Sequence, residues 1–214
     1  HLNQQVEKVE KINNSEWVIS TNQGKIIQAK CIVIAAGAGS FVPRKPPLEG
    51  IENFEGKNVF YSIKDKSIFK NKTILIAGGG DSALDWTNEL SKIAKVNLIH
   101  RRKEFRAAPD SVSKMLELEK NDILSFFTGQ LKGISAGSNK SLKVQYQDND
   151  NLHYIEVDYL LPFYGLKMEL GPIANWGLNL HENHIRVDTE KFETSIPSIF
   201  AIGDINTYLG KLKL

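Results

Sequence analysis

The sequence lacks the residues and runs that mark several common classes of protein. It holds a single cysteine, Cys31, which excludes an internal disulfide, a CxxC redox pair and a cysteine zinc site. It has no apolar run of about 18 residues, so we predict no membrane span. The polar N-terminal stretch has no apolar signal-peptide core. A formal net charge of +2 is too small to indicate a nucleic-acid partner.

Recognisable reactive groups are missing as well. The five histidines have no metal-ligand spacing, no serine or cysteine stands in a nucleophile setting, and no two carboxylates form an acid–base signature. We therefore predict neither a metal nor a catalytic side chain. Cys31 begins the apolar run Cys31–Ala35, which favours a buried structural thiol. A lone thiol without disulfides suits a reducing cytoplasm, so we predict a cytoplasmic protein.

Residues 72–106 contain the pattern that is most informative about function. A short apolar strand, Thr73–Ala77, precedes a glycine break and a helical pattern, and a second apolar strand, Val96–His100, follows. The spacing Gly78-x-Gly80-x-x-Ala83 matches the dinucleotide-binding fingerprint, in which two glycines permit the turn and admit the pyrophosphate and a small third residue lets the helix pack. We predict that the following residues bind a dinucleotide, the alternative being a structural glycine turn: Gly78, Gly79, Gly80, Asp81, Ser82 and Ala83.

The second strand ends in arginines where an NAD site usually carries an acidic residue. Arg101 and Arg102 follow His100 directly, and Arg106 follows four residues later. Guanidinium groups match the geometry of phosphate, so this cluster predicts NADP(H) rather than NAD. The alternative is a solvated basic turn. His100 either stacks or hydrogen-bonds near the adenosine or caps the strand.

The remaining patterns predict an α/β fold: a Rossmann-like domain with a parallel sheet plus an antiparallel β-meander. A β-α-β-α-β pattern runs from Thr73 to Phe127, with a helix that Asp110 or Ser111 caps and that presents Val112, Met115 and Leu116 on one face. Flanking segments read as follows: strands at 6–12, 16–20 and 25–35, with 31–36 buried on both faces; a proline linker near 41–47; a short strand at 58–62; meander strands at 130–135, 141–147 and 154–162; a return linker at 163–172; and a strand at 199–202.

Two further breaks follow apolar strands. Ala36 and Gly37 end the third predicted strand, and Gly203 and Asp204 end the last one. Small residues would let a ligand approach the backbone closely, and an aspartate there could accept hydrogen bonds from ligand hydroxyls. A plain tight turn and a turn aspartate are the alternatives.

Together these stretches resemble two-dinucleotide-domain flavoproteins of the thioredoxin reductase type, and within them the ferredoxin (flavodoxin)–NADP reductase branch. The resemblance covers essentially the whole chain. The stretches that match the family are 32–37, 78–86, 100–107 and 200–204, and those closest to the branch are 80–86, 170–173, 176–178 and 206–213.

The resemblance implies an NADP-binding domain, residues 43–166, inserted in a partial FAD domain made of residues 1–42 and 167–214. It implies FAD contacts at Ala36, Gly37, Gly203 and Asp204, and NADPH contacts at residues 78–83 and the three arginines. It also implies a fragment that lacks the N-terminal FAD fingerprint and the C-terminal end of the FAD domain.

The activity that the resemblance implies is hydride transfer from NADPH to FAD, followed by electron transfer to ferredoxin or flavodoxin, in a protein that is commonly a homodimer. Two positions depart from the pattern. Residues 61–65 have no cysteine where thioredoxin reductases carry a dithiol, and Leu209 stands where the branch usually has proline. Two alternatives remain: a thioredoxin reductase-like disulfide reductase, which the missing CxxC disfavours, and a non-catalytic NADP-binding module.

Overall fold

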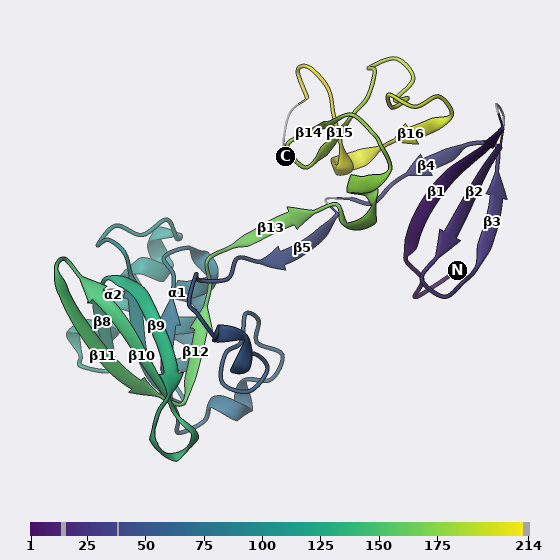
Figure 1. Ribbon diagram of the computed structural model, residues 1–214. Coiled ribbons are helices and arrows are strands. Elements are labelled where there is room, and N and C mark those ends of the chain that lie inside the picture. Colours follow the sequence, from purple (N-terminus) through teal and green to yellow (C-terminus); the bar gives the residue numbers. More distant parts are fainter. Residues whose placement is uncertain (14–15, 38, 212–214) are drawn as a thin grey trace. The chain divides into compact units, whose positions relative to one another are not determined.

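The computed structural model describes residues 1–13, 16–37 and 39–211 and divides the chain into two units (Figure 1). Unit 1 comprises residues 1–42 and 167–214, and unit 2 comprises residues 43–166. Unit 2 is therefore one continuous stretch inserted between two segments of unit 1. The assignment of FAD to unit 1 and NADP to unit 2 stays a prediction. Some residues of the predicted turns and of the stretches that match the family lie outside the described residues: Asn14, Ser15, Ala38, Leu212 and Lys213.

A parallel four-stranded sheet forms the centre of unit 2, with two helices as crossovers (Figure 1). The predicted β-α-β-α-β pattern is confirmed, and a fourth strand joins it. The strands, in sheet order, are β12 (Tyr159–Pro162), β6 (Thr73–Ala77), β7 (Lys95–His100) and β8 (Leu124–Thr128), and the helices are α1 (Asp81–Leu90) and α2 (Pro109–Lys120).

The continuously apolar sequence of β6 reflects burial on both faces of the sheet. Successive side chains of a strand point to opposite faces. Ile74 and Ile76 pack with Leu84 and Met115 of the helices, whereas Leu75 packs in a second cluster with residues of the meander. The helices therefore cover one face and the meander covers the other.

That meander is antiparallel, as predicted, but its last predicted strand is wrong. Residues 154–162 form two strands, because the chain leaves the meander at Asp158. The Asp158 carboxylate Oδ2 accepts a 2.8 Å hydrogen bond from the Thr73 amide, which places β12 parallel to β6. The meander strands are β9 (Gln130–Ala136), β10 (Leu142–Asp148) and β11 (Asn151–Val157).

Two smaller predictions for unit 2 are also wrong. Residues 58–62 form no strand, because Val59 makes only isolated bridges. Helix α2 begins at Pro109 and has no side-chain cap, because its N-cap residue is Ala108; Asp110 and Ser111 lie within the helix, where the Ser111 hydroxyl donates to Asp85 Oδ1. On its predicted apolar face Met115 is buried, whereas Leu116 is 49% exposed.

The 3₁₀ helices of unit 2 are η1 (Ile51–Asn53), η2 (Lys66–Phe69) and η3 (Ser138–Lys140).

Unit 1 contains an antiparallel meander and a parallel strand pair around a small core that includes Trp17, Ile34 and Ile185. The meander comprises β1 (Val6–Asn13), β2 (Glu16–Thr21) and β3 (Ile26–Ala29), and the parallel pair comprises β4 (Ile32–Ile34) and β16 (Ile199–Ala201). The other elements are β5 (Ser40–Pro43), β13 (Leu166–Glu169), β14 (Leu180–His181), β15 (His184–Arg186), β17 (Asn206–Thr207), η4 (Gly171–Asn175) and η5 (Gly203–Ile205).

The prediction of a buried Cys31 is wrong, since its side chain is exposed. The predicted strand 25–35 is interrupted at Lys30 and Cys31, because β3 pairs with β2 whereas β4 pairs with β16. Cys31 thus lies in the connection between two sheets. Val33 is 55% exposed, so β4 is not buried on both faces either. No helix among the described residues is both long enough and apolar enough to cross a membrane.

Candidate functional site

The turn between β6 and α1 requires glycine at its first position. Gly78 has φ +156°, and a Cβ built there would lie 2.6 Å from the carbonyl oxygen of Phe163 and 3.0 Å from the Cβ of Ala83. Ala83 is fully buried against the same turn. A larger residue at either position would push the helix away from the strand. This close packing explains why the fingerprint has glycine at the first position and a small residue at the third.

Open space lies beside the start of α1. Gly80 is the N-cap residue and has ordinary extended angles, with φ −101°, and a Cβ built there would meet no atom within 4 Å. The carbonyl of Gly80 accepts from the amides of Ala83 and Leu84. The first amides of a helix have no acceptor within the helix and carry its positive dipole end, so the space beside Gly80 suits an anionic group.

His100, the last residue of β7, forms a wall of this turn. A Cβ on Gly79 would overlap the His100 imidazole. The ring stacks on Phe105, which in turn contacts Phe126 at 5.3 Å between ring centroids. Burial, and then the nearby Arg101 and Arg102 charges, lower the pKa of His100 below its ordinary value. The imidazole is therefore neutral at neutral pH and packs as an aromatic ring.

The segment 101–108, which we call the arginine loop, runs from β7 back to the glycine turn. The amide of Arg106 donates to the carbonyl of Gly79 at 2.8 Å. The side chains of Arg101, Arg102 and Arg106 are exposed. Within the described residues their guanidinium groups have no hydrogen-bond or ion-pair partner. Three unpaired cations are thus attached to a loop that contacts the turn.

Carboxylates of α1 contact the end of this loop and the helix that follows. The Oδ1 atom of Asp81 accepts from the Ala108 amide at 2.7 Å, and Asp85 Oδ1 accepts from the Ser111 hydroxyl at 2.6 Å. Asn88 adds a bond to the carbonyl of Ser111. Sequence reasoning missed the contact between Asp85 and Ser111, although the i, i+4 spacing of the two aspartates places both on one face of the helix.

In unit 1 the second set of predicted residues comes together at one edge. Strands β4 and β16 are parallel, and the Ile202 amide donates to the Ile34 carbonyl at 2.9 Å. The residues that follow these strands, Ala36, Gly37, Gly203 and Asp204, are all exposed at the carboxyl ends of the pair. In open parallel sheets this is the edge where nucleotides bind. The Asp204 carboxylate has no partner within the described part of the chain.

A lysine that sequence reasoning missed supports this edge. The ammonium group of Lys211 donates to the carbonyls of Gly203, at 2.7 Å, and Asn206, at 2.9 Å. It also donates to Asn206 Oδ1 at 2.7 Å, while the buried Asn206 amide donates to the Ala201 carbonyl. These bonds fix the backbone on both sides of Asp204. No sequence spacing marks Lys211, because its acceptors are mostly backbone atoms.

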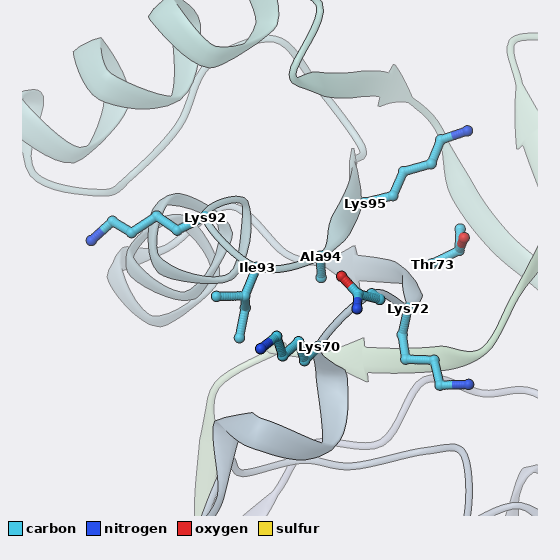
Figure 2. A pocket seen from close by; sticks show the side chains of 8 residues that line it. Lys70, Lys72, Thr73, Lys92, Ile93, Ala94 and Lys95 are labelled. Atoms are coloured by element: carbon cyan, nitrogen blue, oxygen red, sulfur yellow. The ribbon is translucent and has the colours of Figure 1, made fainter.

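A basic hollow in unit 2 lies at the start of β6 and β7, away from the glycine turn, which follows the end of β6 (Figure 2). It has a volume of about 590 Å³. Lys92 pairs with Glu89, and the Lys72 ammonium lies 4.0 Å from Asp158. Figure 2 shows the ammonium groups pointing in different directions, so they do not converge on a ligand. The hollow is lined by Lys70, Asn71, Lys72, Thr73, Lys92, Ile93, Ala94 and Lys95.

The described residues contain no group of three or more His, Cys, Asp or Glu side chains placed to hold a metal ion. Each unit contains one candidate nucleotide site. One consists of the glycine turn and the arginine loop in unit 2, and the other of the β4 and β16 edge in unit 1.

Comparisons with known proteins show which proteins this chain is similar to. The ferredoxin–NADP reductase of Parvibaculum lavamentivorans is 55% identical over 100% of this chain and 63% of its own length, and that of Mesorhizobium japonicum is 50% identical over 99% and 62%. The chain thus spans less than two thirds of these relatives. The thioredoxin reductase structure of Lactococcus lactis covers 96% of the chain and matches over 66% of its own, with a TM-score of 0.73 and 25% identity.

The resemblance stated from the sequence motifs is confirmed by these relatives and by a family model. The model for pyridine nucleotide-disulphide oxidoreductases matches residues 1–213. The chain belongs to the pyridine nucleotide-disulphide oxidoreductase family.

Proposed function

We propose that this chain acts in a flavoprotein oxidoreductase that transfers hydride from NADPH to FAD and then electrons to ferredoxin or flavodoxin. The observation that carries the proposal is the arginine loop, which is hydrogen-bonded to a dinucleotide-type glycine turn and presents three guanidinium groups that have no partner in the described part of the chain. The relatives named ferredoxin–NADP reductase support the same reaction. A homodimer and a cytoplasmic location complete the proposal.

The NADPH site would use the two features of the glycine turn. The open space beside Gly80 would admit the pyrophosphate, next to the backbone of Gly78, Gly79 and the first residues of α1, Asp81 to Ala83. The guanidinium groups of Arg101, Arg102 and Arg106 would pair with the additional phosphate that distinguishes NADP from NAD. The neutral ring of His100 would close one side.

The FAD site would use the carboxyl edge of β4 and β16. Gly37 has φ +57° and Gly203 has φ +77°, so both adopt left-handed angles that favour glycine, and a Cβ on either would meet no atom within 4 Å. Ala36, which precedes Gly37, carries only a methyl group and would also let a ligand approach the backbone closely. The free carboxylate of Asp204 would accept hydrogen bonds from ribityl hydroxyls or lie near the phosphates through its backbone. When bound, the two cofactors supply the redox chemistry, and these residues bind and orient them.

The cysteine content of this chain supports electron transfer without a dithiol. The chain has only Cys31, and the segment 61–65 has no thiol at the position where the resemblance implies one. Tyr61 instead donates a 2.7 Å hydrogen bond to Glu55, which also pairs with Lys45. A disulfide reductase would need a pair of cysteines whose disulfide receives two electrons from the flavin and becomes two thiols. The proposal therefore passes electrons directly to a protein acceptor.

Anaerobic titration of the FAD-loaded protein tests the proposal. We expect about one equivalent of NADPH to bleach the flavin absorbance, since one hydride reduces one flavin. The reduced protein should then reduce ferredoxin or flavodoxin, and it should not reduce a disulfide substrate. A flavin that stays oxidised while NADPH is not consumed would contradict the proposal.

A non-catalytic NADP-binding module is the second candidate, because unit 2 is continuous and holds the whole glycine turn and arginine loop. The same titration separates the two functions. Tight NADP+ binding without flavin retention or reduction would favour the module.

A further inference from the structure

We infer that Asp81 is a positioning residue for the arginine loop and thereby determines the preference for NADP over NAD. The inference rests on the proposed function of the glycine turn and sharpens it. The fingerprint position of Asp81 predicts a contact with the cofactor. The carboxylate instead lies on the loop that carries the phosphate-binding arginines.

The arginine loop is connected to the rest of unit 2 at few points. It leaves β7 after His100, and the Arg106 amide contacts the Gly79 carbonyl. It ends at Ala108, whose amide donates to Asp81 Oδ1 at 2.7 Å. The guanidinium groups themselves have no partner among the described residues, so the arginines are held by the loop backbone, by the Phe105 ring and by a hydrogen bond between the His100 ring and the Glu104 backbone. The Ala108 carbonyl also accepts from the Val112 amide of α2, so removing the Asp81 acceptor would loosen the loop at the Ala108 amide while its end stays attached to α2.

The chemistry of the site makes a direct contact with the added phosphate unfavourable for Asp81. Two anions at short distance repel each other, whereas an aspartate in the first turn of a helix is stabilised by the helix dipole. The bond to Ala108 uses one carboxylate oxygen for the loop. A carboxylate that bound the ribose shared by both dinucleotides would affect NAD and NADP equally. A carboxylate that positions the arginines affects NADP alone.

Asp85 provides a matched control on the same helix. It lies one turn further along α1 and accepts from the Ser111 hydroxyl, which belongs to the first turn of α2 and not to the arginine loop. Asn88 also bonds the Ser111 carbonyl, so this end of α2 keeps a second connection when Asp85 is replaced. Asp85→Ala therefore removes a carboxylate of α1 without releasing Ala108.

The test measures the dissociation constants of NADP+ and NAD+ for the wild-type protein, Asp81→Ala, Asp81→Asn and Asp85→Ala. We expect Asp81→Ala to weaken NADP+ binding about 10- to 100-fold, which corresponds to the loss of one hydrogen bond to a charged group, and to change NAD+ binding less than about twofold. Asp81→Asn should restore NADP+ binding, because its Oδ1 atom still accepts from Ala108. Asp85→Ala should resemble the wild-type protein.

Hydrogen exchange adds a readout that does not depend on the cofactor. The Ala108 amide should exchange faster in Asp81→Ala than in the wild-type protein, and Asp81→Asn should protect it again. Equal losses of NADP+ and NAD+ in Asp81→Ala, or an unchanged NADP+ preference, would overturn the inference while the proposed function stands. A wild-type protein without any preference for NADP+ would instead contradict the proposed function. If Asp81→Ala does not fold, Asp81→Asn decides, since failure to keep the preference there overturns the inference.

Discussion

The imidazole ring of His100 stacks on the phenyl ring of Phe105, with centroids 5.5 Å apart and planes inclined by 26°. The same imidazole lies against Gly79. One ring thus joins the end of β7, the glycine turn and the arginine loop. A side chain at Gly79 would therefore require the His100 ring to move.

Gly79→Ala should therefore destabilise the fold. The added Cβ would overlap the His100 ring, which must move away from Phe105. Overpacking of a packed site costs about 1–3 kcal/mol, so we expect a free energy of unfolding lower by that amount in urea denaturation. An unchanged stability would show that the His100 ring moves away without loss.

Gly80→Ala is the matched variant of Gly79→Ala. We expect it to keep the stability of the fold and to weaken NADP+ binding. Its Cβ would meet no atom within 4 Å, and its φ of −101° suits alanine. The loss of glycine flexibility in the unfolded chain favours alanine, whereas the N-cap position favours glycine, so the free energy of unfolding should change by less than about 1 kcal/mol. The methyl group would fill the space assigned to the pyrophosphate. We expect NADP+ binding measured by calorimetry to weaken at least about tenfold, which is ~1.4 kcal/mol. Unchanged affinity would place the pyrophosphate elsewhere.

The lowered pKa of His100 predicts a pH dependence of stability. Burial is its main cause, and the ordinary value is 6.5. As the pH falls below that value the unfolded chain takes up the proton first, so the stability linked to the neutral ring is lost as the pH falls further. The difference in free energy of unfolding between wild type and His100→Gln should shrink from pH 7.5 to pH 5. A difference that grows would show that the folded imidazole binds the proton more tightly.

Tyr61 and Lys45 stabilise the ionised form of Glu55 in unit 2. Hydrogen bonds from Lys45 first, and then from Tyr61, lower the pKa of Glu55 below 4.5. This stabilisation is present above pH 4.5 and is lost as the pH falls through the lower folded value. Tyr61→Phe should cost about 1 kcal/mol at pH 7 and less at pH 3, as measured by urea denaturation at both values. An equal cost at both values would contradict the role of the carboxylate charge.

Lys211→Met should weaken the FAD site proposed in unit 1. The ammonium group has three acceptors around Gly203 and Asn206, and its loss leaves them unpaired at a cost of about 1–3 kcal/mol. We expect a lower ratio of FAD to protein after purification. Lys30→Met removes an exposed lysine of the same unit and should retain FAD. Equal retention in both variants would exclude a role for Lys211.

The sequence predicted the elements whose signals are local. The apolar run Thr73–Ala77 marks a strand buried on both faces, and the glycine spacing marks the turn that follows it. It did not predict that the chain would leave the meander at Asp158, because the partner of that residue, Thr73, lies 85 residues away. The exposure of Cys31 was missed for a related reason, since the exchange of sheets there depends on pairing with β16.

The candidate site shows the same division. The arginines are visible as a cluster at the end of a strand, whereas the bonds that attach their loop join residues 27 positions apart, Asp81 and Ala108. The bond that the Ser111 hydroxyl donates to the Asp85 carboxylate spans 26 positions. Residue type alone assigns an aspartate in a fingerprint to the cofactor, and only the folded geometry shows its contact with the loop.

The most direct test of the central claim compares NADP+ and NAD+ binding in the wild-type protein, the Arg101→Ala/Arg102→Ala variant and Lys103→Ala, which removes an exposed cation of the same loop. Two charged hydrogen bonds of about 1.5–3 kcal/mol each predict a wild-type preference for NADP+ of about 10²–10⁴. The double variant should lose most of that preference and bind NAD+ as before, while Lys103→Ala keeps the preference. Equal losses of both dinucleotides, or a wild-type protein that binds them equally, would contradict the assignment of the arginine loop to the phosphate.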